Sequence, residues 1–556
     1  MSLAVVRSRA LVGMAAPPVS VEVHLGMGLP AFHVVGLPEA EVRESRERVR
    51  AALLHAGFDF PNRRLTVNLA PADLPKDSGR FDLPIALGIL AASGQFPADS
   101  LSGIEFVGEL SLTGEVRPIR GALAMAAAVS RDAGARSLAL PAANATEAAL
   151  VEGLRILAAD TLPRLVGQLR GEAPFDRVDA RRPGEPAGGR PPRPGGRLPE
   201  SDQPRARNAA PDFSAVKGHR AAKRALEIAA AGSHSVLMLG PPGAGKSLLA
   251  SCLPAILPPM DDHEALEAAA VASLAGRFHP QDWGRRPFRA PHHSASTAAL
   301  VGGGPNPRPG EISLAHRGVL FLDELPEFGR AALEALREPL ETGRIALSRA
   351  ARQVELPADF QLVAAMNPCP CGYLGEDRCR CSPERVLRYQ ARVSGPLLDR
   401  VDIQIQVRPV DEQVLTSSAE GESSEQIQAR VAVTRARQVG RQGVANAALD
   451  PVGIDRHCPL GGEALALLHG AARRLRWSSR ALHRVIRLAR TIADLAGRAD
   501  IAAADIGEAI GYRRGLMPGA APGRDAGLSS RQPTSSSRRF AQSSTSSTRV
   551  RGIERA

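Results

Sequence analysis

Apolar and polar residues alternate through much of the first 110 residues, as half-buried strands require. Residues 20–36 read as two strands joined by a Gly-rich turn, and residues 63–70 and 103–110 are further strand candidates. Between them, residues 39–57 read as a helix that Gly57 ends. The pattern predicts an α+β region at the start of the chain.

A different pattern follows in the second half of the chain. SVLMLG, residues 235–240, is a short apolar strand that runs into a glycine loop and then a helix, which is the entry to an α/β nucleotide-binding domain. From about residue 455 onward the pattern is purely helical. The predicted fold class is therefore an α+β domain, then an α/β P-loop domain with a C-terminal helical lid.

Two stretches are too poor in large apolar residues to offset the entropy of ordering. One is rich in Pro, Gly and Arg, and the other ends in SSSRRFAQSSTSSTR; we predict a disordered linker and a disordered basic tail. The predicted divisions are 1–170 for the first domain, 171–210 for the linker, 211–410 for the ATPase domain, 411–516 for the lid and 517–556 for the tail.

Composition excludes several classes of protein. None of the 556 residues lies in a window apolar enough for a membrane span, and the N-terminus is too weakly apolar for a secretory signal, so we expect a cytoplasmic protein without a membrane partner. The net charge is +12, but much of it lies in the predicted tail, so bulk charge supports DNA binding only weakly. Six cysteines in so long a chain do not form a disulfide framework.

The clearest chemical motif is GPPGAGKS, which matches GxxxxGK[ST] in full between a predicted strand and a predicted helix. Its glycines let backbone N–H groups wrap phosphates, Lys246 would reach the β and γ phosphates, and Ser247 would ligate Mg²⁺. The alternative is a chance glycine turn. The predicted ATP-binding residues are Gly240, Pro241, Pro242, Gly243, Ala244, Gly245, Lys246 and Ser247.

A second motif, GVLFLDELPEF, complements the first. Four apolar residues, 319–322, predict a buried strand that ends in Asp323 and Glu324, and acids at that end of a strand face the phosphate site. Asp323 would hold Mg²⁺ through water, and Glu324 would polarise the attacking water. The alternative is a helix N-cap, with both acids placed against the dipole.

Five motifs together resemble a known family over nearly all of the chain outside the linker and tail. GPPGAGKS, RAPHHSAS, GEISLAHRGVLFLDELPEF, AAMNPCPCG and RVSGPLLDRVDIQ are similar to the magnesium-chelatase-like AAA+ ATPases of the ComM or YifB group. The resemblance implies that Asn367 is the sensor-1 residue, Arg400 the arginine finger for a neighbouring subunit and Arg480 the sensor-2 residue. It further implies that Val216, Gly218 and His219 line the adenine pocket.

Other interpretations of the arginines stay open. Arg392 is a rival finger, and Arg400 could make a surface salt bridge instead. Arg480, Arg484 and Arg487 share one helical face by their spacing, and that face could simply be solvated.

Four cysteines cluster within thirteen residues as CPC, seven residues, then CRC: Cys369, Cys371, Cys379 and Cys381. Four thiolates at this separation can close a tetrahedron around Zn²⁺, with Gly372 and Gly375 helping the loop turn back. Reduced thiols without metal are the alternative. We predict core packing for Cys252 and Cys458, and we do not expect the adjacent His292 and His293 to form a two-histidine metal site.

The first domain resembles the Lon protease domain through GLPEAEVRESRERVRAAL, PKDSGRFDLPIALG and GEVRPIRGAL. By that resemblance Arg80 stands in the place of the nucleophilic serine and Leu123 in the place of the activating lysine, so no peptidase activity is expected. Ser78 is two positions early, and nothing places it against Lys76 as a working base. Lys76 and Arg80 could form a basic surface for DNA, or the domain could be purely structural.

These motifs lead to three functional hypotheses. The resemblance implies an ATP-driven hexameric ring that acts on branched or single-stranded DNA and drives branch migration in recombination and natural transformation. The alternatives are the motor subunit of a metal chelatase and an ATP-driven protein remodeller. Intact catalytic motifs argue against a passive scaffold.

Overall fold

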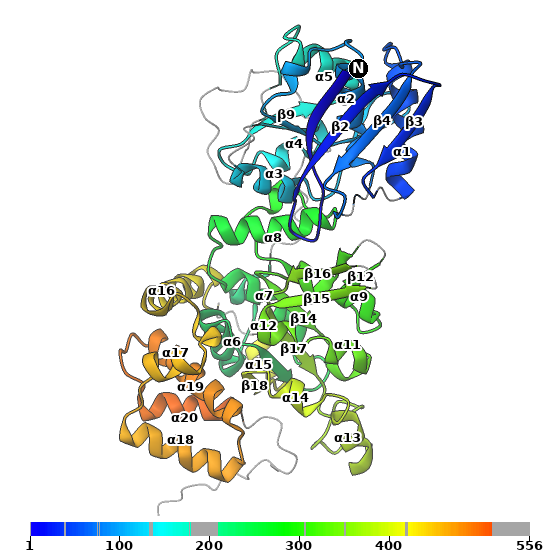
Figure 1. The fold of residues 1–556 in the computed structure, drawn as a ribbon. Helices are drawn as coiled ribbons and strands as arrows, with labels where there is room; N and C mark the ends of the chain where they lie inside the picture. The colour runs from blue at the N-terminus through cyan, green and yellow to red at the C-terminus, as the bar shows by residue number, and fades with distance from the viewer. Residues whose placement is uncertain are drawn as a thin grey trace, which may run out of the picture. The chain divides into compact units, whose positions relative to one another are not determined.

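A computed structural model describes residues 2–37, 40–74, 76, 78–132, 137–176, 178, 210–304, 307–349, 352–416 and 421–513. The predicted tail, 517–556, and most of the predicted linker, 171–210, lie outside these ranges. The first region, the P-loop region and the helical region each have their own colours in Figure 1. The predicted divisions between domains stay a prediction.

The first region contains a seven-stranded mixed sheet in the order β3-β4-β2-β1-β5-β8-β9. Along β2 every second side chain is buried, as the alternating sequence predicts. The strands are β1 Ser2–Arg9, β2 Pro18–Gly26, β3 Ala31–Val35, β4 Arg64–Ala70, β5 Ile104–Phe106, β8 Ser137–Pro141 and β9 Arg155–Ala159. The helices are α1 Ala40–His55, α2 Asp82–Ala92, α3 Ala122–Arg131, α4 Ala142–Ala148 and α5 Leu162–Leu169.

Most predicted elements of this region are present, and one is divided. Residues 20–36 form β2 and β3, and residues 39–57 contain α1. The candidate strand at 103–110 breaks into β5 and β6 Glu109–Leu110, which pairs with β7 Val116–Arg117. The break falls at Gly108, whose amide donates to the carbonyl of Arg80 instead of to a strand. α2 is buried almost throughout because its sequence is apolar on all sides.

The P-loop region is built on a five-stranded parallel sheet in the order β11-β14-β17-β10-β18. Its strands are β11 Phe288–Arg289, β14 Val319–Leu322, β17 Gln361–Met366, β10 Val236–Leu239 and β18 Ile403–Gln406. Because all five strands are parallel, their carboxyl ends meet at one edge of the sheet, where ligands of α/β proteins bind. The sheet therefore brings the ends of β10, β14 and β17 together.

Before, between and after these strands the chain forms ten α-helices of the described region and two antiparallel strand pairs. The helices are α6 Arg220–Gly232, α7 Lys246–Ile256, α8 Asp262–Leu274, α9 Thr297–Val301, α10 Glu311–Leu314, α11 Arg330–Glu334, α12 Pro339–Thr342, α13 Pro383–Gln390, α14 Gly395–Leu398 and α15 Glu412–Thr416. The hairpins are β12 Gly302–Gly303 with β13 Arg308–Pro309, and β15 Arg344–Arg349 with β16 Arg352–Pro357.

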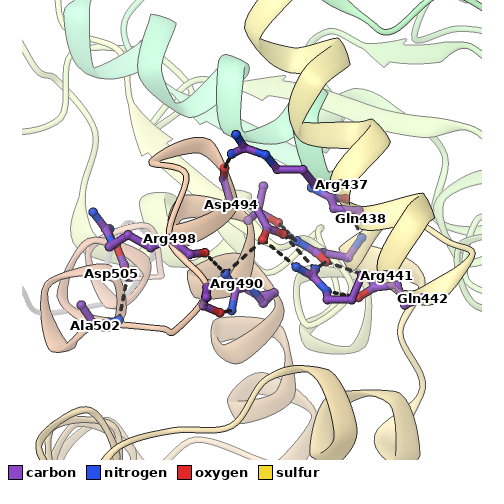
Figure 2. A network of polar contacts seen from close by, with 12 residues as sticks. Arg437, Gln438, Arg441, Gln442, Arg490, Asp494, Arg498, Ala502 and Asp505 are labelled. Carbon is purple, nitrogen blue, oxygen red and sulfur yellow. Dashed lines mark hydrogen bonds and ion pairs between the residues drawn. The ribbon is translucent and has the colours of Figure 1, made fainter.

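The last described region is helical, as predicted, and starts earlier than residue 455. It contains α16 Ser424–Gln442, α17 Pro451–His457, α18 Gly462–Leu475, α19 Ser479–Leu495 and α20 Ala503–Gly511. α16 begins at a full capping box in which Ser423 and Gln426 bond each other's backbone amides. Figure 2 shows the polar network that joins α16 to α19 around the buried carboxylate of Asp494. No described helix is long and apolar enough to cross a membrane.

Candidate nucleotide site

The glycine loop turns between β10 and α7 in the conformation that its sequence predicts. A Cβ at Gly240 would collide with the carbonyl oxygen of Val407, and Gly243 and Gly245 have φ of 77° and 79°, which disfavour other residues. The amide of Gly240 donates to the carbonyl of Met366, the last residue of β17, at 3.2 Å. The loop is thereby fixed to the neighbouring strand and leads into the N-terminus of α7, which attracts phosphate.

Lys246 and Ser247 are positioned at the start of α7. Lys246 Nζ donates to the carbonyls of Gly240 and Pro241, both at 2.8 Å, and to Asn367 Oδ1 at 3.1 Å. Ser247 Oγ donates to Asp323 Oδ2 at 2.6 Å. Burial lowers the pKa of Lys246, while the carboxylates of Asp323 and Glu324 oppose that shift. Residues from β10, β14 and β17 thus converge on one point.

This arrangement suits magnesium and a nucleoside triphosphate. The Ser247 hydroxyl and the Asp323 carboxylate are hard oxygen donors of the kind that Mg²⁺ takes in phosphate sites, and their hydrogen bond shows that both can reach one ion. Lys246 is the only cation among the four side chains that meet here. The structure supports the grouping that the sequence predicts; the role of each residue stays a prediction.

Glu324 has a partner that sequence reasoning missed. His293 Nδ1 lies 2.9 Å from Glu324 Oε2, and the His293 ring lies against that of His292 at a tilt of 34°, with centroids 4.1 Å apart. Because β11 pairs in parallel with β14, the segment that follows β11 ends beside Glu324. The only sequence signal was a polar PHHS stretch directly after a short strand. The two histidines do not gather a metal cluster among the described residues.

The three residues predicted to line an adenine pocket lie upstream of α6. Val216 is buried, and Gly218, with φ of 67°, packs against Val410. His219 lies over the phosphate loop, because a Cβ on Gly245 would be 3.3 Å from His219 Nε2. Burial, helped by the charge of Lys223, lowers the pKa of His219. The placement of His219 beside the loop fits an adenine-side contact.

The predicted finger and sensor-2 arginines lie together. Arg400 is 7% exposed and its Nη2 lies 2.6 Å from Glu341 Oε1; Arg480, whose side chain is 70% exposed, lies 3.4 Å from the same oxygen. Within the described part of the chain, Arg480 forms no ion pair or hydrogen bond with Lys246 or Ser247. The two arginines are therefore held as a pair on one carboxylate of α12.

A second set of contacts fixes the segment that carries Arg400. Arg484 Nη1 donates to the Arg400 carbonyl at 2.9 Å and to Asp402 Oδ1 at 2.5 Å, and His234 Nδ1 lies 3.4 Å from Asp402 Oδ2. Burial alone would raise the pKa of Asp402, but Arg484 and His234 hold it well below its usual range. The solvated-face interpretation is thus wrong for Arg484. The rival finger, Arg392, is more exposed and pairs with Glu327 at 2.8 Å.

Comparison with known proteins places these features in a family. Residues 212–415 match the family described as magnesium chelatase, subunit ChlI; residues 21–144 match subunit ChlI of Mg-chelatase, and residues 421–513 match the C-terminal part of that subunit. The competence protein ComM of Haemophilus influenzae is 47% identical over 517 residues, which cover 92% of this chain and 98% of the relative. The chain belongs to the magnesium-chelatase-like ComM/YifB family.

Other members show the same coverage. YifB of Escherichia coli is 45% identical over 515 residues, with 92% of this chain and 97% of the relative aligned. An uncharacterised protein of Mycobacterium tuberculosis is 40% identical over 514 residues, with 91% and 98% aligned. Membership of this AAA+ family implies ATP and Mg²⁺ as cofactors. The match at residues 21–144 is to a chelatase description, so the Lon resemblance stays a prediction.

The four clustered cysteines meet in space. Sγ of Cys369 lies 3.3 Å from that of Cys371 and 3.9 Å from that of Cys379, and the Cys371 and Cys379 sulfurs are 3.6 Å apart. All four sulfurs, including that of Cys381, lie within 4.8 Å of one another. Cys252 and Cys458 are buried in the apolar core, as predicted.

The basic-surface interpretation of the first domain is wrong for this chain. Lys76 is 0% exposed and donates to the carbonyl of Pro71, and Arg80 is 5% exposed with its Nε bonded to Ser78 Oγ at 2.8 Å. Long polar side chains are usually exposed, but here each of the two donates to a local oxygen acceptor inside the fold. Neither group is presented to the phosphates of a DNA strand by this fold.

Proposed function

We propose that this protein is an ATP-driven ring motor that acts on DNA and drives branch migration during recombination and natural transformation. The observation that carries the proposal is the meeting of Lys246, Ser247, Asp323 and Asn367 at one sheet edge, in a chain that aligns with a competence protein over 92% of its length. Competence is the state in which bacteria take up DNA. A motor for recombination intermediates works where the chromosome is, so the proposal includes a cytoplasmic location.

Each residue has a role in this proposal. Lys246 contacts the β and γ phosphates, Ser247 and Asp323 hold Mg²⁺, Glu324 polarises the attacking water, and Asn367 orients it. The glycine loop from Gly240 to Gly245 binds the phosphates, with Val216, Gly218 and His219 on the adenine side. These roles supply positioning and charge, which is what phosphoryl transfer needs from a protein.

The pairing of Arg400 and Arg480 on Glu341 supports a ring. Lys246 alone supplies little positive charge in the transition state, and among the described residues Arg400 and Arg480 bond to Glu341 and not to the glycine loop. We propose that both arginines serve the nucleotide of a neighbouring subunit, which requires an oligomer, with six subunits as the expected number. ATP would then bind between subunits.

A motor subunit of a metal chelatase is the second candidate, because all three matching family descriptions name the chelatase subunit ChlI. An ATP-driven protein remodeller is the third. For cofactors, the proposal comprises ATP and Mg²⁺ at the glycine loop and Zn²⁺ at the four cysteines.

The test is ATP hydrolysis measured alone, with a synthetic four-way DNA junction, with single-stranded DNA, with protoporphyrin and with casein. We expect stimulation by the junction and branch migration of a labelled junction. Lys246→Ala and Glu324→Gln should each abolish both activities, the latter while retaining nucleotide binding. Stimulation by protoporphyrin or casein but not by DNA would contradict the DNA proposal, and full hydrolysis in either variant would contradict the site.

A further inference from the structure

We propose that the cysteine loop, residues 369–381, binds one zinc ion, and that this metal-held loop is a structural wall of the nucleotide site. The proposal rests on the proposed ATPase function for its second half only. The metal site itself follows from the geometry of the four sulfurs.

The donor set fits zinc. A tetrahedron with Zn–S bonds of about 2.3 Å has sulfur–sulfur edges of about 3.8 Å. The three sulfur–sulfur distances among Cys369, Cys371 and Cys379 are 3.3, 3.9 and 3.6 Å. Four thiolates in a tetrahedron select zinc over oxygen-preferring cations.

The loop can reach back on itself because of two glycines. Gly372 has φ of 87° and Gly375 has φ of 89°, in the left-handed region that other residues rarely adopt. The amide of Gly372 closes a turn on the carbonyl of Cys369 at 2.9 Å. The two CxC pairs therefore approach each other without a regular element between them.

The same loop contacts the phosphate loop directly. A Cβ at Gly372 would collide with the ring of Pro242, so the backbone of the cysteine loop lies against the glycine loop. Cys369, which is fully buried, follows Asn367 by two residues, and Asn367 accepts from Lys246 Nζ. One short segment thus carries a metal ligand and two contacts to the nucleotide site.

A third contact anchors the loop from α13. Gln390 Nε2 donates to the carbonyl of Pro368 at 2.9 Å, between Asn367 and Cys369. Without a metal, four thiols have no strong reason to stay within 4.8 Å of one another, and a loop without secondary structure costs conformational entropy to order. Zinc would provide that ordering, and through Pro242 and Asn367 it would hold the glycine loop in place.

The experiment measures zinc binding and nucleotide binding separately. Wild type, Cys379→Ser, Gly372→Ala and Cys458→Ala are purified without chelator; zinc is measured by metal analysis and affinity by titration with a fluorescent ATP analogue. Cys458 is the matched control, since it is buried in the helical region outside the cluster. We expect about one equivalent of zinc in wild type and in Cys458→Ala, and less in Gly372→Ala, because the turn at that residue needs a positive φ. Cys379→Ser should lose the metal.

Nucleotide affinity should fall about tenfold or more in both Cys379→Ser and Gly372→Ala, since small displacements of positioning groups have large effects. Cys458→Ala should bind as wild type does. Removing zinc from wild type with a thiol-reactive mercurial should weaken nucleotide binding, and restoring the thiols and the zinc should recover it. This reversible test uses no substituted protein, so misfolding of a variant cannot explain its result.

Two outcomes would overturn the inference. Less than about a tenth of an equivalent of zinc in wild type removes the metal site, because a four-thiolate site survives purification. If zinc-free protein binds nucleotide with wild-type affinity, the cysteine loop does not support the nucleotide site. Neither outcome depends on DNA, so a failure here is distinct from a failure of the DNA proposal.

Discussion

Asp494→Asn should destabilise the helical region far more than its single lost charge suggests. The Asp494 carboxylate is almost fully buried and accepts from Arg441 at 2.7 and 2.9 Å, from Asn446 at 2.8 Å and from Arg490 at 3.0 Å (Figure 2). Arg490 is 1% exposed and also donates to two backbone carbonyls. The substitution keeps the shape of the side chain but leaves two guanidinium groups without this counter-charge.

The expected magnitude follows from burial. Removing one partner of a buried ion pair typically costs about 3–5 kcal/mol, because the remaining charge stays desolvated. For a folded region of about 150–250 residues, each kcal/mol lost from the free energy of unfolding lowers Tm by about 2–4 °C, so Tm should fall by about 6–20 °C. The exposed pair Glu422–Arg430, with both side chains 45% exposed, should contribute no more than about 1 kcal/mol.

The assay is thermal unfolding followed by circular dichroism at 222 nm, with Glu422→Gln as the matched control and ATPase half-life at raised temperature as a second readout. Asp494→Asn should unfold early and inactivate early, while the control should follow wild type within about 1 kcal/mol. Equal Tm values for the two variants would show that the network in Figure 2 does not depend on the carboxylate charge, and would refute the reasoning.

Four further predictions concern the site and the first domain. Arg400→Ala should lower kcat at least a hundredfold, because an arginine finger stabilises the charge of the transition state. Nucleotide affinity, and assembly measured by light scattering, should change little. If only Arg392→Ala shows this loss, Arg392 is the finger. Because the pKa of folded Asp402 is depressed, its stabilisation is fully present above the unfolded-state pKa of about 4 and is lost as pH falls from there through the folded-state pKa. A Tm that falls as steeply on acidification in Asp402→Asn would contradict this. Lys76→Met should keep wild-type DNA affinity and salt slope, because Lys76 is buried; weaker binding by a folded variant would restore the basic-surface interpretation. The protein should not cleave casein in the presence of ATP. Cleavage that is lost in Ser78→Ala would contradict the expectation that the first domain has no peptidase activity.

The nucleotide site could be predicted because its signal is local. A strand, a glycine loop and a helix follow one another between residues 235 and 256, and their spacing alone puts Lys246 and Ser247 at a helix N-terminus. Asp323 could be added because a buried apolar strand ending in acids has few other interpretations. The four cysteines also lie close in sequence, so their meeting needed only a turn.

Pairings between distant elements could not be predicted. Nothing in the stretch around His293 shows that it contacts Glu324, because that contact depends on β11 lying beside β14 in the sheet. In the same way, Glu341 carries no motif, yet it holds both Arg400 and Arg480. Lys76 and Arg80 were misjudged because residue type predicts average exposure, whereas local acceptors decide the individual case.

The arginines of α19 connect the helical region to the part of the sheet that carries the phosphate loop. Arg484 holds Asp402 at the start of β18, and Asp402 in turn accepts from the amide of Ser235 at the start of β10. One turn away on the same helix, Arg480 shares Glu341 with Arg400. Because β10 pairs with β18 and leads directly into the glycine loop, a displacement of α19 would act together on Arg400 and on the strand that carries the glycine loop. In the proposed motor, a rigid connection of this kind would allow nucleotide binding at one position to move an arginine at another.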